Sequence, residues 1–223
     1  MISQLFSNLK KNRKMQFFIT FLIIVLSIWI YAAINHTDQK TSFTPNSLSP
    51  EQKEKIIAIK KATKGLFTHM RFADTLHDMS QLSFKDIQGK DHKLAEFQGK
   101  LVLINLWAIW CLPCRIEMPE LAKLKREIGG ENFDVIAINV EQAASPEKIQ
   151  QFLQNVGADN LIYYRDPTMD IFTNIRKQGL ALGLPVTFLI DKNGHLIASF
   201  NGMAPWASDD AKAFIEAAIK ETQ

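Results

Sequence analysis

The chain has 223 residues, of which 47% are hydrophobic and 22% charged, which suits one globular domain with an appendage and is too short for two full enzyme domains. The formal net charge is only +3, and no dense stripe of lysine and arginine with interleaved aromatic residues occurs in the globular part. We therefore do not expect a nucleic acid among the partners.

An apolar run of twenty residues, MQFFITFLIIVLSIWIYAAI, covers positions 15–34. As a helix rising about 1.5 Å per residue it would span about 30 Å, the thickness of a bilayer's hydrocarbon core. Basic residues crowd its N-terminal side, whereas the NHTDQK that follows balances its charges. This asymmetry predicts residues 1–14 in the cytoplasm, a transmembrane anchor at 15–34, and export of everything after it.

A cleaved signal peptide and a buried core helix are the alternatives to an anchor. Signal peptides have shorter apolar regions, about 7 to 15 residues, and IYAAIN is a poor cleavage site. A core helix would break its apolar run with polar positions. Anchor and signal peptide both place the rest of the chain in a compartment where disulfides form.

Residues 35–80 are predicted to be a tether followed by an N-terminal helical segment. The stretch HTDQKTSFTPNSLSP is polar and contains proline, which is typical of a linker. Ser49 can cap a helix with Pro50 in its first turn, and Gly65 offers a stop. We expect this helix to pack on the surface of the main domain.

Residues 81–223 are predicted to form the main domain, because strand and helix patterns alternate there. The first two strands flank the turn Gln88-Gly89-Lys90, and the last two flank Lys192-Asn193-Gly194. The other predicted strands are KLVLINLWA, FDVIAINV and LIYYRD, and the helices are RIEMPELAKLKREI, SPEKIQQFLQNVG, TMDIFTNIRKQG and SDDAKAFIEAAIKE. This order predicts an α/β domain with a mixed sheet flanked by helices.

Cys111 and Cys114 are the only two cysteines. A zinc site needs four ligands, and the five histidines lack a His-x(3-5)-His spacing, so we expect no metal. A structural disulfide closing so small a ring would contribute only about 2 kcal/mol. Redox chemistry fits best, because the pair lies where a buried strand meets a helix N-terminus, which favours a thiolate. Cys111, at an exposed rim with Arg115 nearby, is then the attacking thiolate and Cys114 the resolving thiol.

Several motifs around these cysteines resemble the thioredoxin superfamily. WAIWCLPC followed by Pro119 is similar to its active site, and GLPVTFLID to its cis-proline loop. Together with the predicted anchor and the closing GMAPWASDDA, the motifs look most like TlpA-type membrane-anchored periplasmic thiol:disulfide proteins, relatives of the cytochrome c maturation thioredoxins. The resemblance covers about Gln81 to the C-terminus and implies a thioredoxin-like fold.

The resemblance also implies roles for individual residues. Trp110 would shield the disulfide, with ordinary core packing as the alternative. The Leu184-Pro185 bond would be cis, leaving neighbouring backbone groups free to dock a partner strand; an ordinary trans proline is the alternative. The residues expected to dock the substrate are Trp110, Pro113, Leu184 and Pro185.

This chain departs from the thioredoxin pattern at two positions. Asn105 stands where thioredoxins bury an aspartate, and an asparagine cannot shuttle a proton. Glu117, three residues after Cys114 on the same helix face, could take that role, as the matching glutamate is thought to do in related proteins; a solvated helix glutamate is the alternative. Val186 follows the cis-proline where several relatives have glutamate, which weakens any transfer of their substrate.

The expected function is thiol:disulfide exchange, with the Cys111–Cys114 disulfide as the redox group and no other cofactor. Leu112 and Pro113 place no polar side chain between the cysteines, which favours a reductant over an oxidant. By resemblance, the clients are cysteine pairs of cytochrome c or of the copper site of cytochrome oxidase, and a transmembrane thiol reductase supplies electrons. The protein would be a monomer on the bacterial inner membrane with its catalytic domain in the periplasm. The alternatives are a thiol oxidase or isomerase, and a copper-binding chaperone on the same fold.

Overall fold

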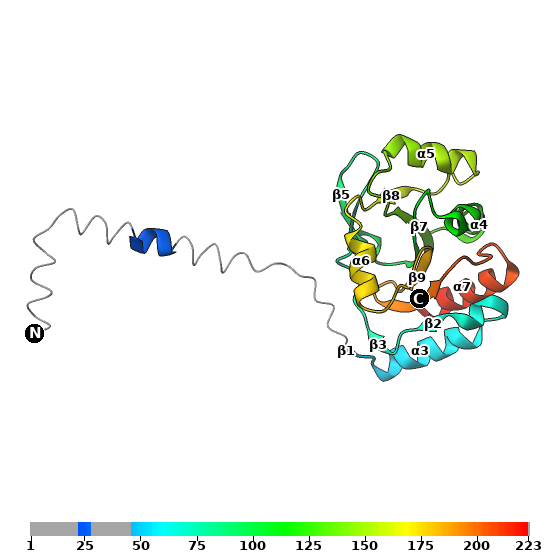
Figure 1. Cartoon of the computed structure of the whole chain (residues 1–223). Helices are drawn as coiled ribbons and strands as arrows, with labels where there is room; N and C mark the ends of the chain where they lie inside the picture. Colours follow the sequence, from blue (N-terminus) through cyan, green and yellow to red (C-terminus); the bar gives the residue numbers. More distant parts are fainter. Residues whose placement is uncertain (1–21, 28–45, 223) are drawn as a thin grey trace, which may run out of the picture. The chain divides into compact units, whose positions relative to one another are not determined.

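The computed structural model describes residues 22–27 and 46–222, and those from 46 onward belong to one compact unit (Figure 1). Of the predicted anchor at 15–34, only residues 22–27 are described, and they are helical. The predicted cytoplasmic segment 1–14 and the first part of the tether lie outside the described residues. Within the described ranges, no helix combines the length and the hydropathy that crossing a membrane requires.

A mixed sheet of eight strands forms the centre of the unit, in the order β2-β10-β9-β6-β7-β8-β4-β5. β7 runs parallel to β6 and β8, and the other neighbours pair antiparallel. This arrangement confirms the predicted mixed sheet. The strands are β2 (Arg71–Phe72), β4 (Ser83–Lys85), β5 (Asp91–Lys93), β6 (Leu101–Trp107), β7 (Phe133–Asn139), β8 (Tyr163–Arg165), β9 (Val186–Ile190) and β10 (Leu196–Asn201), with β1 (Asn46–Ser47) and β3 (Thr75–Leu76) in a separate pair.

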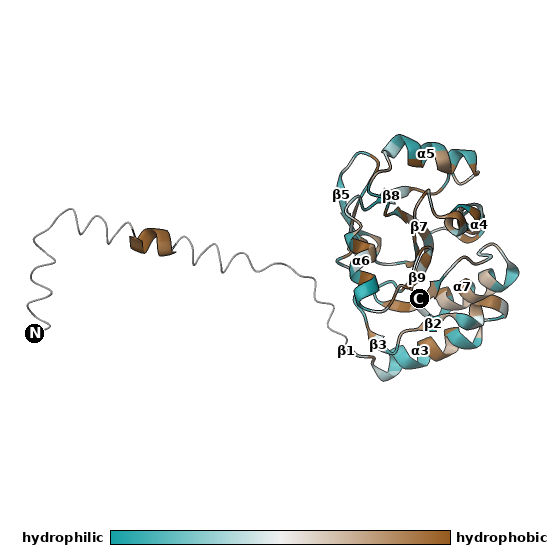
Figure 2. Cartoon of the chain, in the orientation of Figure 1, coloured by the Kyte–Doolittle hydropathy of each residue, from teal (hydrophilic) through white to brown (hydrophobic). Residues whose placement is uncertain are grey.

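The two faces of the sheet carry separate hydrophobic clusters, because side chains alternate along the fully buried strand β6. Leu101 and Leu103 belong to the first cluster, with side chains from α3, α4, α5 and α7. Val102 and Ile104 belong to the second cluster, with side chains from α6 and η2. Figure 2 shows that the helices carry both hydrophilic and hydrophobic residues, as expected when one side of a helix covers the sheet. The helices are α3 (Pro50–Lys61), η1 (Gly65–His69), η2 (Leu94–Phe97), α4 (Leu112–Ile128), α5 (Pro146–Asn155), α6 (Asp170–Lys177) and α7 (Asp209–Thr222).

Helix α3 begins as predicted and ends earlier than predicted. Ser49 is its N-cap and forms a capping box with Gln52. The helix stops at Lys61, and Gly65, expected to be its stop, instead opens the 3₁₀ helix η1 with φ of +52°. A left-handed φ is open to glycine without strain, so the chain can change direction there.

The folded unit starts well before residue 81, where the sequence placed the start of the main domain. The ring of Phe67, only 1% exposed, packs 5.2 Å from that of Trp206 and 6.1 Å from that of Phe214, measured between centroids. Residues 71–72 add strand β2 to the sheet beside β10. The segment before residue 81 therefore contributes to the core, through contacts with the far end of the chain that no local pattern reveals.

Candidate active site

The two cysteines form a disulfide at the N-terminus of α4, with their Cα atoms 5.3 Å apart. Cys111 is the N-cap residue, and its Sγ accepts a hydrogen bond of 3.3 Å from the backbone N–H of Cys114. Free N–H groups and the positive end of the helix dipole favour negative charge at this position. When the disulfide opens, the Cys111 sulfur therefore lies where a thiolate is stabilised.

Exposure around the disulfide differs from the sequence prediction at Cys111, and at Trp110 it rules out the alternative of core packing. Cys111 was expected at an exposed rim, yet it is only 5% exposed, because it belongs to the same core cluster as the fully buried Cys114. Trp110 does not pack in the core but is 62% exposed. The buried tryptophan of the motif is Trp107, at the end of β6.

The loop from β6 to α4 is held by Glu141, which the sequence reasoning missed. The carboxylate of Glu141 accepts a 2.9 Å hydrogen bond from the backbone N–H of Ile109, two residues before Cys111. Glu141 follows β7, the parallel neighbour of β6. Polar residues at the carboxyl ends of adjacent parallel strands often lie together, and that signal could have found it.

Arg115 follows Cys111 in the first turn of α4, where its backbone N–H bonds to the carbonyl of Cys111 at 3.1 Å, and its side chain has a neighbour that the sequence did not predict. Its guanidinium lies 5.6 Å from the centroid of the Phe152 ring on α5. Phe152 in turn packs 5.4 Å from the ring of Trp107. Arg115 therefore braces α4 against α5 through a cation–π contact as well as carrying its charge in the first turn of α4.

Glu117 lies on the buried side of α4, at 1% exposure, so its interpretation as a solvated helix glutamate is wrong. Oε2 accepts a 3.1 Å hydrogen bond from Nδ2 of Asn105. Oε1 accepts a 3.2 Å bond from the backbone N–H of Ala204 and another from Nε1 of Trp206. Nδ2 of Asn105 also donates to Thr187 Oγ1, 2.9 Å away on β9. All three groups that bind the carboxylate are neutral donors.

Burial raises the pKa of Glu117 to about 7, and the hydrogen bonds from Trp206, Ala204 and Asn105 oppose that increase. Desolvation penalises the carboxylate, whereas donors stabilise it. The balance leaves a group that can gain or lose a proton near neutral pH. Such a group, three residues from Cys114 on one helix face, has the properties of a general base for that thiol.

The Leu184–Pro185 bond is cis, as the resemblance predicted. Leu184 packs against the hydrophobic cluster that contains both cysteines. The expectation of free backbone groups holds only in part, because the carbonyl of Pro185 accepts a 2.9 Å hydrogen bond from the N–H of Gly202. Val186, the first residue of β9, is buried and pairs with Leu106 on β6.

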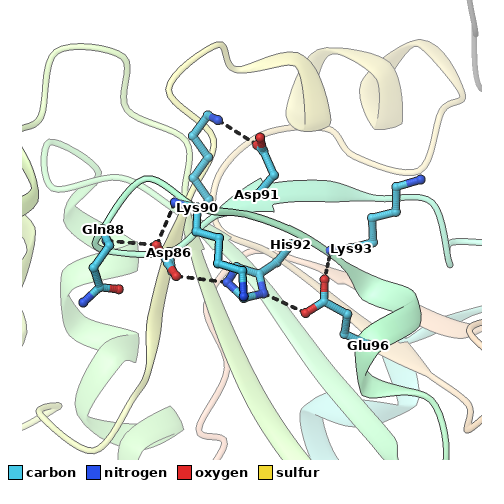
Figure 3. A network of polar contacts seen from close by, with 8 residues as sticks. Asp86, Gln88, Lys90, Asp91, His92, Lys93 and Glu96 are labelled. Atoms are coloured by element: carbon cyan, nitrogen blue, oxygen red, sulfur yellow. Dashed lines mark hydrogen bonds and ion pairs between the residues drawn. The ribbon is translucent and has the colours of Figure 1, made fainter.

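A second polar cluster lies on the hairpin of β4 and β5 (Figure 3). His92 is held between Asp86, at 3.0 Å from Nε2, and Glu96, at 2.7 Å from Nδ1. These hydrogen bonds, Asp86 first and Glu96 second, raise the pKa of His92. Asp86 and His92 also line a cavity of about 360 Å³, which contains none of the predicted site residues. The cluster fastens the hairpin and is not part of the thiol site.

The part of the chain that is described contains no group of three histidine, cysteine or acidic side chains arranged to hold a metal ion.

Comparisons with known proteins agree with this geometry. Residues 73–215 match the family described as Redoxin. The chain is 31% identical to the thiol-disulfide oxidoreductase ResA of Geobacillus thermodenitrificans over 135 residues, which cover 59% of this chain and 70% of that protein. It is 32% identical to the thiol:disulfide interchange protein HelX of Rhodobacter capsulatus over 107 residues, covering 47% of this chain and 53% of HelX.

Among solved structures, a crystal structure assigned to a thiol:disulfide interchange protein DsbE of Chlorobium tepidum superimposes with a TM-score of 0.53. Its sequence identity is 27%, and the match covers 64% of this chain and 95% of that one. The resemblance to thioredoxin-like thiol:disulfide proteins is confirmed by these matches.

Proposed function

The chain belongs to the Redoxin family and is a thiol:disulfide oxidoreductase, and from that premise we propose that it reduces disulfides of exported client proteins. The observation that carries the exchange chemistry, in either direction of electron flow, is the position of Cys111 as N-cap of α4, with its sulfur accepting the N–H of Cys114. The reduced dithiol is the electron donor in this direction of reaction.

The first step is attack by the Cys111 thiolate on one sulfur of a client disulfide. A sulfur–sulfur bond forms between Cys111 and the client, and the client's other sulfur leaves as a thiolate. The helix N-terminus stabilises negative charge on the attacking sulfur and so favours the thiolate. No proton transfer to Cys111 is needed at this step.

The second step is attack by Cys114 on the mixed disulfide, which re-forms the Cys111–Cys114 bond and releases the client as a dithiol. Cys114 is fully buried and must lose a proton to react. Apolar surroundings oppose that loss, so a nearby base is required. Glu117 is buried on the same helix one turn further on, with a pKa of about 7, and we assign it this role.

The surface around the disulfide is suited to an extended client segment. Trp110, Leu112 and Ile116 are 62%, 65% and 55% exposed, so the start of α4 presents large apolar side chains to solvent. Leu182, at 78% exposure, lies two residues before Leu184. Exposed apolar patches of this kind mark interaction sites. With the exposed Pro113 and the half-buried Leu184 they form the proposed docking surface, whereas Pro185, also predicted to dock the substrate, is buried.

The direction of electron flow and the clients are proposed from the sequence. Leu112 and Pro113 supply no polar group that would strongly stabilise the thiolate, which favours a reductant. By the resemblance to cytochrome c maturation thioredoxins, the clients are cysteine pairs of cytochrome c or of the copper site of cytochrome oxidase. A transmembrane thiol reductase would return electrons to the oxidised protein.

The decisive experiment traps the mixed disulfide. In the full-length chain, Cys114→Ser should accumulate client proteins linked through Cys111, because the resolving sulfur is missing. Cys111→Ser is the matched control and should link to none. Alkylation of the wild-type protein in intact cells should find it mostly as the dithiol. A mostly oxidised wild-type protein would instead support a thiol oxidase.

We also propose that the protein is a monomer anchored in the bacterial inner membrane by residues 15–34, with the catalytic domain in the periplasm. The support is the apolar run itself and the four basic residues ahead of it, Lys10, Lys11, Arg13 and Lys14. A reporter active only in the periplasm, fused after Gln223, should be active, and one active only in the cytoplasm should be silent. The reverse pattern would refute the proposed orientation.

A further inference from the structure

Trp206 contacts the buried carboxylate of the active site from the far end of the sequence. Its indole Nε1–H donates to Oε1 of Glu117, and the residue is fully buried. The backbone N–H of Ala204 reaches the same oxygen at 3.2 Å. Two donors from one short segment therefore converge on a single carboxylate oxygen.

A tight turn brings these two donors together. Pro205 restricts its own φ, and the N–H of Trp206 bonds back to the carbonyl of Ala204 at 2.9 Å. The next N–H, that of Ala207, donates to Oε2 of Glu120 at 3.1 Å. The turn at 204–207 thus binds two glutamates of α4, one turn of helix apart.

The indole ring is held in place by aromatic side chains from other elements. Phe67 of η1 lies 5.2 Å from it and Phe200 of β10 lies 6.2 Å away, the latter edge to face. Such contacts fix the orientation of a ring, and a fixed ring fixes the direction of its N–H. The donor to Glu117 is therefore preorganised by the core.

We propose that Trp206 is a positioning residue for the thiol exchange: its indole N–H orients the Glu117 carboxylate and stabilises its charged form, ready to accept the proton of Cys114. The inference rests on the proposed function, in which Glu117 takes that proton. Trp206 acts through Glu117 and does not contact the sulfur chemistry itself.

The test separates the two sulfur steps. The reduced full-length chain, in mild detergent, is mixed with the chromogenic disulfide dithiobis(nitrobenzoate). Attack by Cys111 releases one coloured thiolate, and attack by Cys114 on the resulting mixed disulfide releases a second. The rate of the second release is measured from pH 5 to pH 9 for wild type, Trp206→Phe and Glu117→Gln.

Removing the indole N–H should raise the midpoint of the second release by about one pH unit, the size expected for losing one hydrogen bond to a charged group. From a wild-type midpoint near 7, that shift slows the second release about fivefold at pH 7 and leaves it almost unchanged at pH 9. The first release should keep its wild-type rate, because Cys111 does not depend on Glu117.

A merely structural role for Trp206 would give a different result. Phe214→Leu is the matched control, since Phe214 packs against Phe67 in the same aromatic cluster and has no polar group. Phe214→Leu should lower the melting temperature without moving the pH midpoint of the second thiolate release. If Trp206→Phe fails to fold, 3-benzothienylalanine at position 206 keeps the ring shape and removes only the N–H.

The outcomes are distinguishable. A midpoint unchanged in the position-206 variants but moved in Glu117→Gln would overturn the role of Trp206 alone. An unchanged pH profile of the second release in the position-206 variants and in Glu117→Gln would remove both residues from the mechanism. In that case, loss of both thiolate releases in Cys111→Ser would still support the thiol exchange. A loss of rate that is equal at every pH would also reject positioning.

Discussion

Asn105 is fully buried at the position where the thioredoxin pattern has an aspartate, and its amide serves another purpose there. It bridges Thr187 on the neighbouring strand and the carboxylate of Glu117 on the helix above. A donor at this position stabilises the Glu117 carboxylate, whereas an aspartate would repel it. In the proposed mechanism the acid–base group therefore lies on the helix rather than on the strand, and the strand residue donates to it.

The raised pKa of Glu117 predicts how stability depends on pH. The folded-state pKa of about 7 exceeds the ordinary value of 4.5, so the folded protein binds the proton more tightly than the unfolded chain does. The resulting stabilisation is complete below about pH 4.5 and is lost as the pH rises through 7. Relative to Glu117→Gln, the oxidised wild type should lose about 3 kcal/mol of unfolding free energy between pH 4.5 and pH 8.

Urea denaturation of both proteins at several pH values in this range measures that difference. A glutamine side chain does not titrate, so the Glu117→Gln variant serves as the reference for every other group in the chain. Parallel pH dependences for the two proteins would show that Glu117 has an ordinary pKa despite its burial.

At the residue scale, the sequence predicted the roles that depend on local spacing. The cysteine spacing and its place between strand and helix located the redox pair, and three residues' separation placed Glu117 on the face of Cys114. Trp206 and Ala204 could not be found in this way, because they lie 89 and 87 residues from Glu117. Nothing in GMAPW itself indicates that its partner is a buried acid.

At the scale of elements, the first turns of α4 are held by contacts from two other parts of the chain. Glu141 holds the loop that enters it, and the turn at 204–207 binds Glu117 and Glu120. Pro119 lies inside the helix and removes one backbone donor there. These anchors keep the disulfide end of α4 in place although its outer side is exposed.

We predict that the 3₁₀ helix η1 is as important to stability as the helices and strands after residue 81. Phe67→Ala should lower the unfolding free energy by about 3 to 5 kcal/mol, because it removes a buried ring and leaves a cavity beside Trp206. The neighbouring Leu66 is 42% exposed, and Leu66→Ala should cost no more than about 0.5 kcal/mol. Equal effects in urea denaturation would mean that η1 is only a surface attachment.

The sequence predicted most elements correctly because their signals are local: caps such as Ser49, apolar runs such as that of β6, and the turn at Asn193-Gly194. The sequence placed the start of the folded unit too late, because the features that mark this start are not local. Phe67 and strand β2 are recognised as parts of the core only through their contacts with α7, Trp206 and β10. Isolated short segments carry no signal for partners so distant.

At the scale of the whole molecule, the reduction potential tests the direction of electron flow. With only Leu112 and Pro113 between the cysteines, we expect a value near thioredoxin's roughly −270 mV rather than the strong oxidant's roughly −120 mV. The difference of about 150 mV corresponds to about 7 kcal/mol for a two-electron couple, so equilibration with glutathione decides between them.

Pro113→His is the matched variant for this measurement. A histidine between the cysteines stabilises the thiolate and should make the potential more oxidising than that of the wild type. A wild-type potential above about −180 mV, the value typical of disulfide isomerases, would be incompatible with a reductant.

The separation of 87 residues between Glu117 and the turn at Ala204 also sets an order of events during synthesis. Chains grow at about 5 to 20 residues per second, so both cysteines exist on the order of ten seconds before that turn does. During that interval the carboxylate of Glu117 lacks the hydrogen bonds from Ala204 and Trp206. A polypeptide that ends before residue 204 would carry a complete Cys-x-x-Cys motif without these two donors to Glu117, so we expect its second sulfur step to be slow.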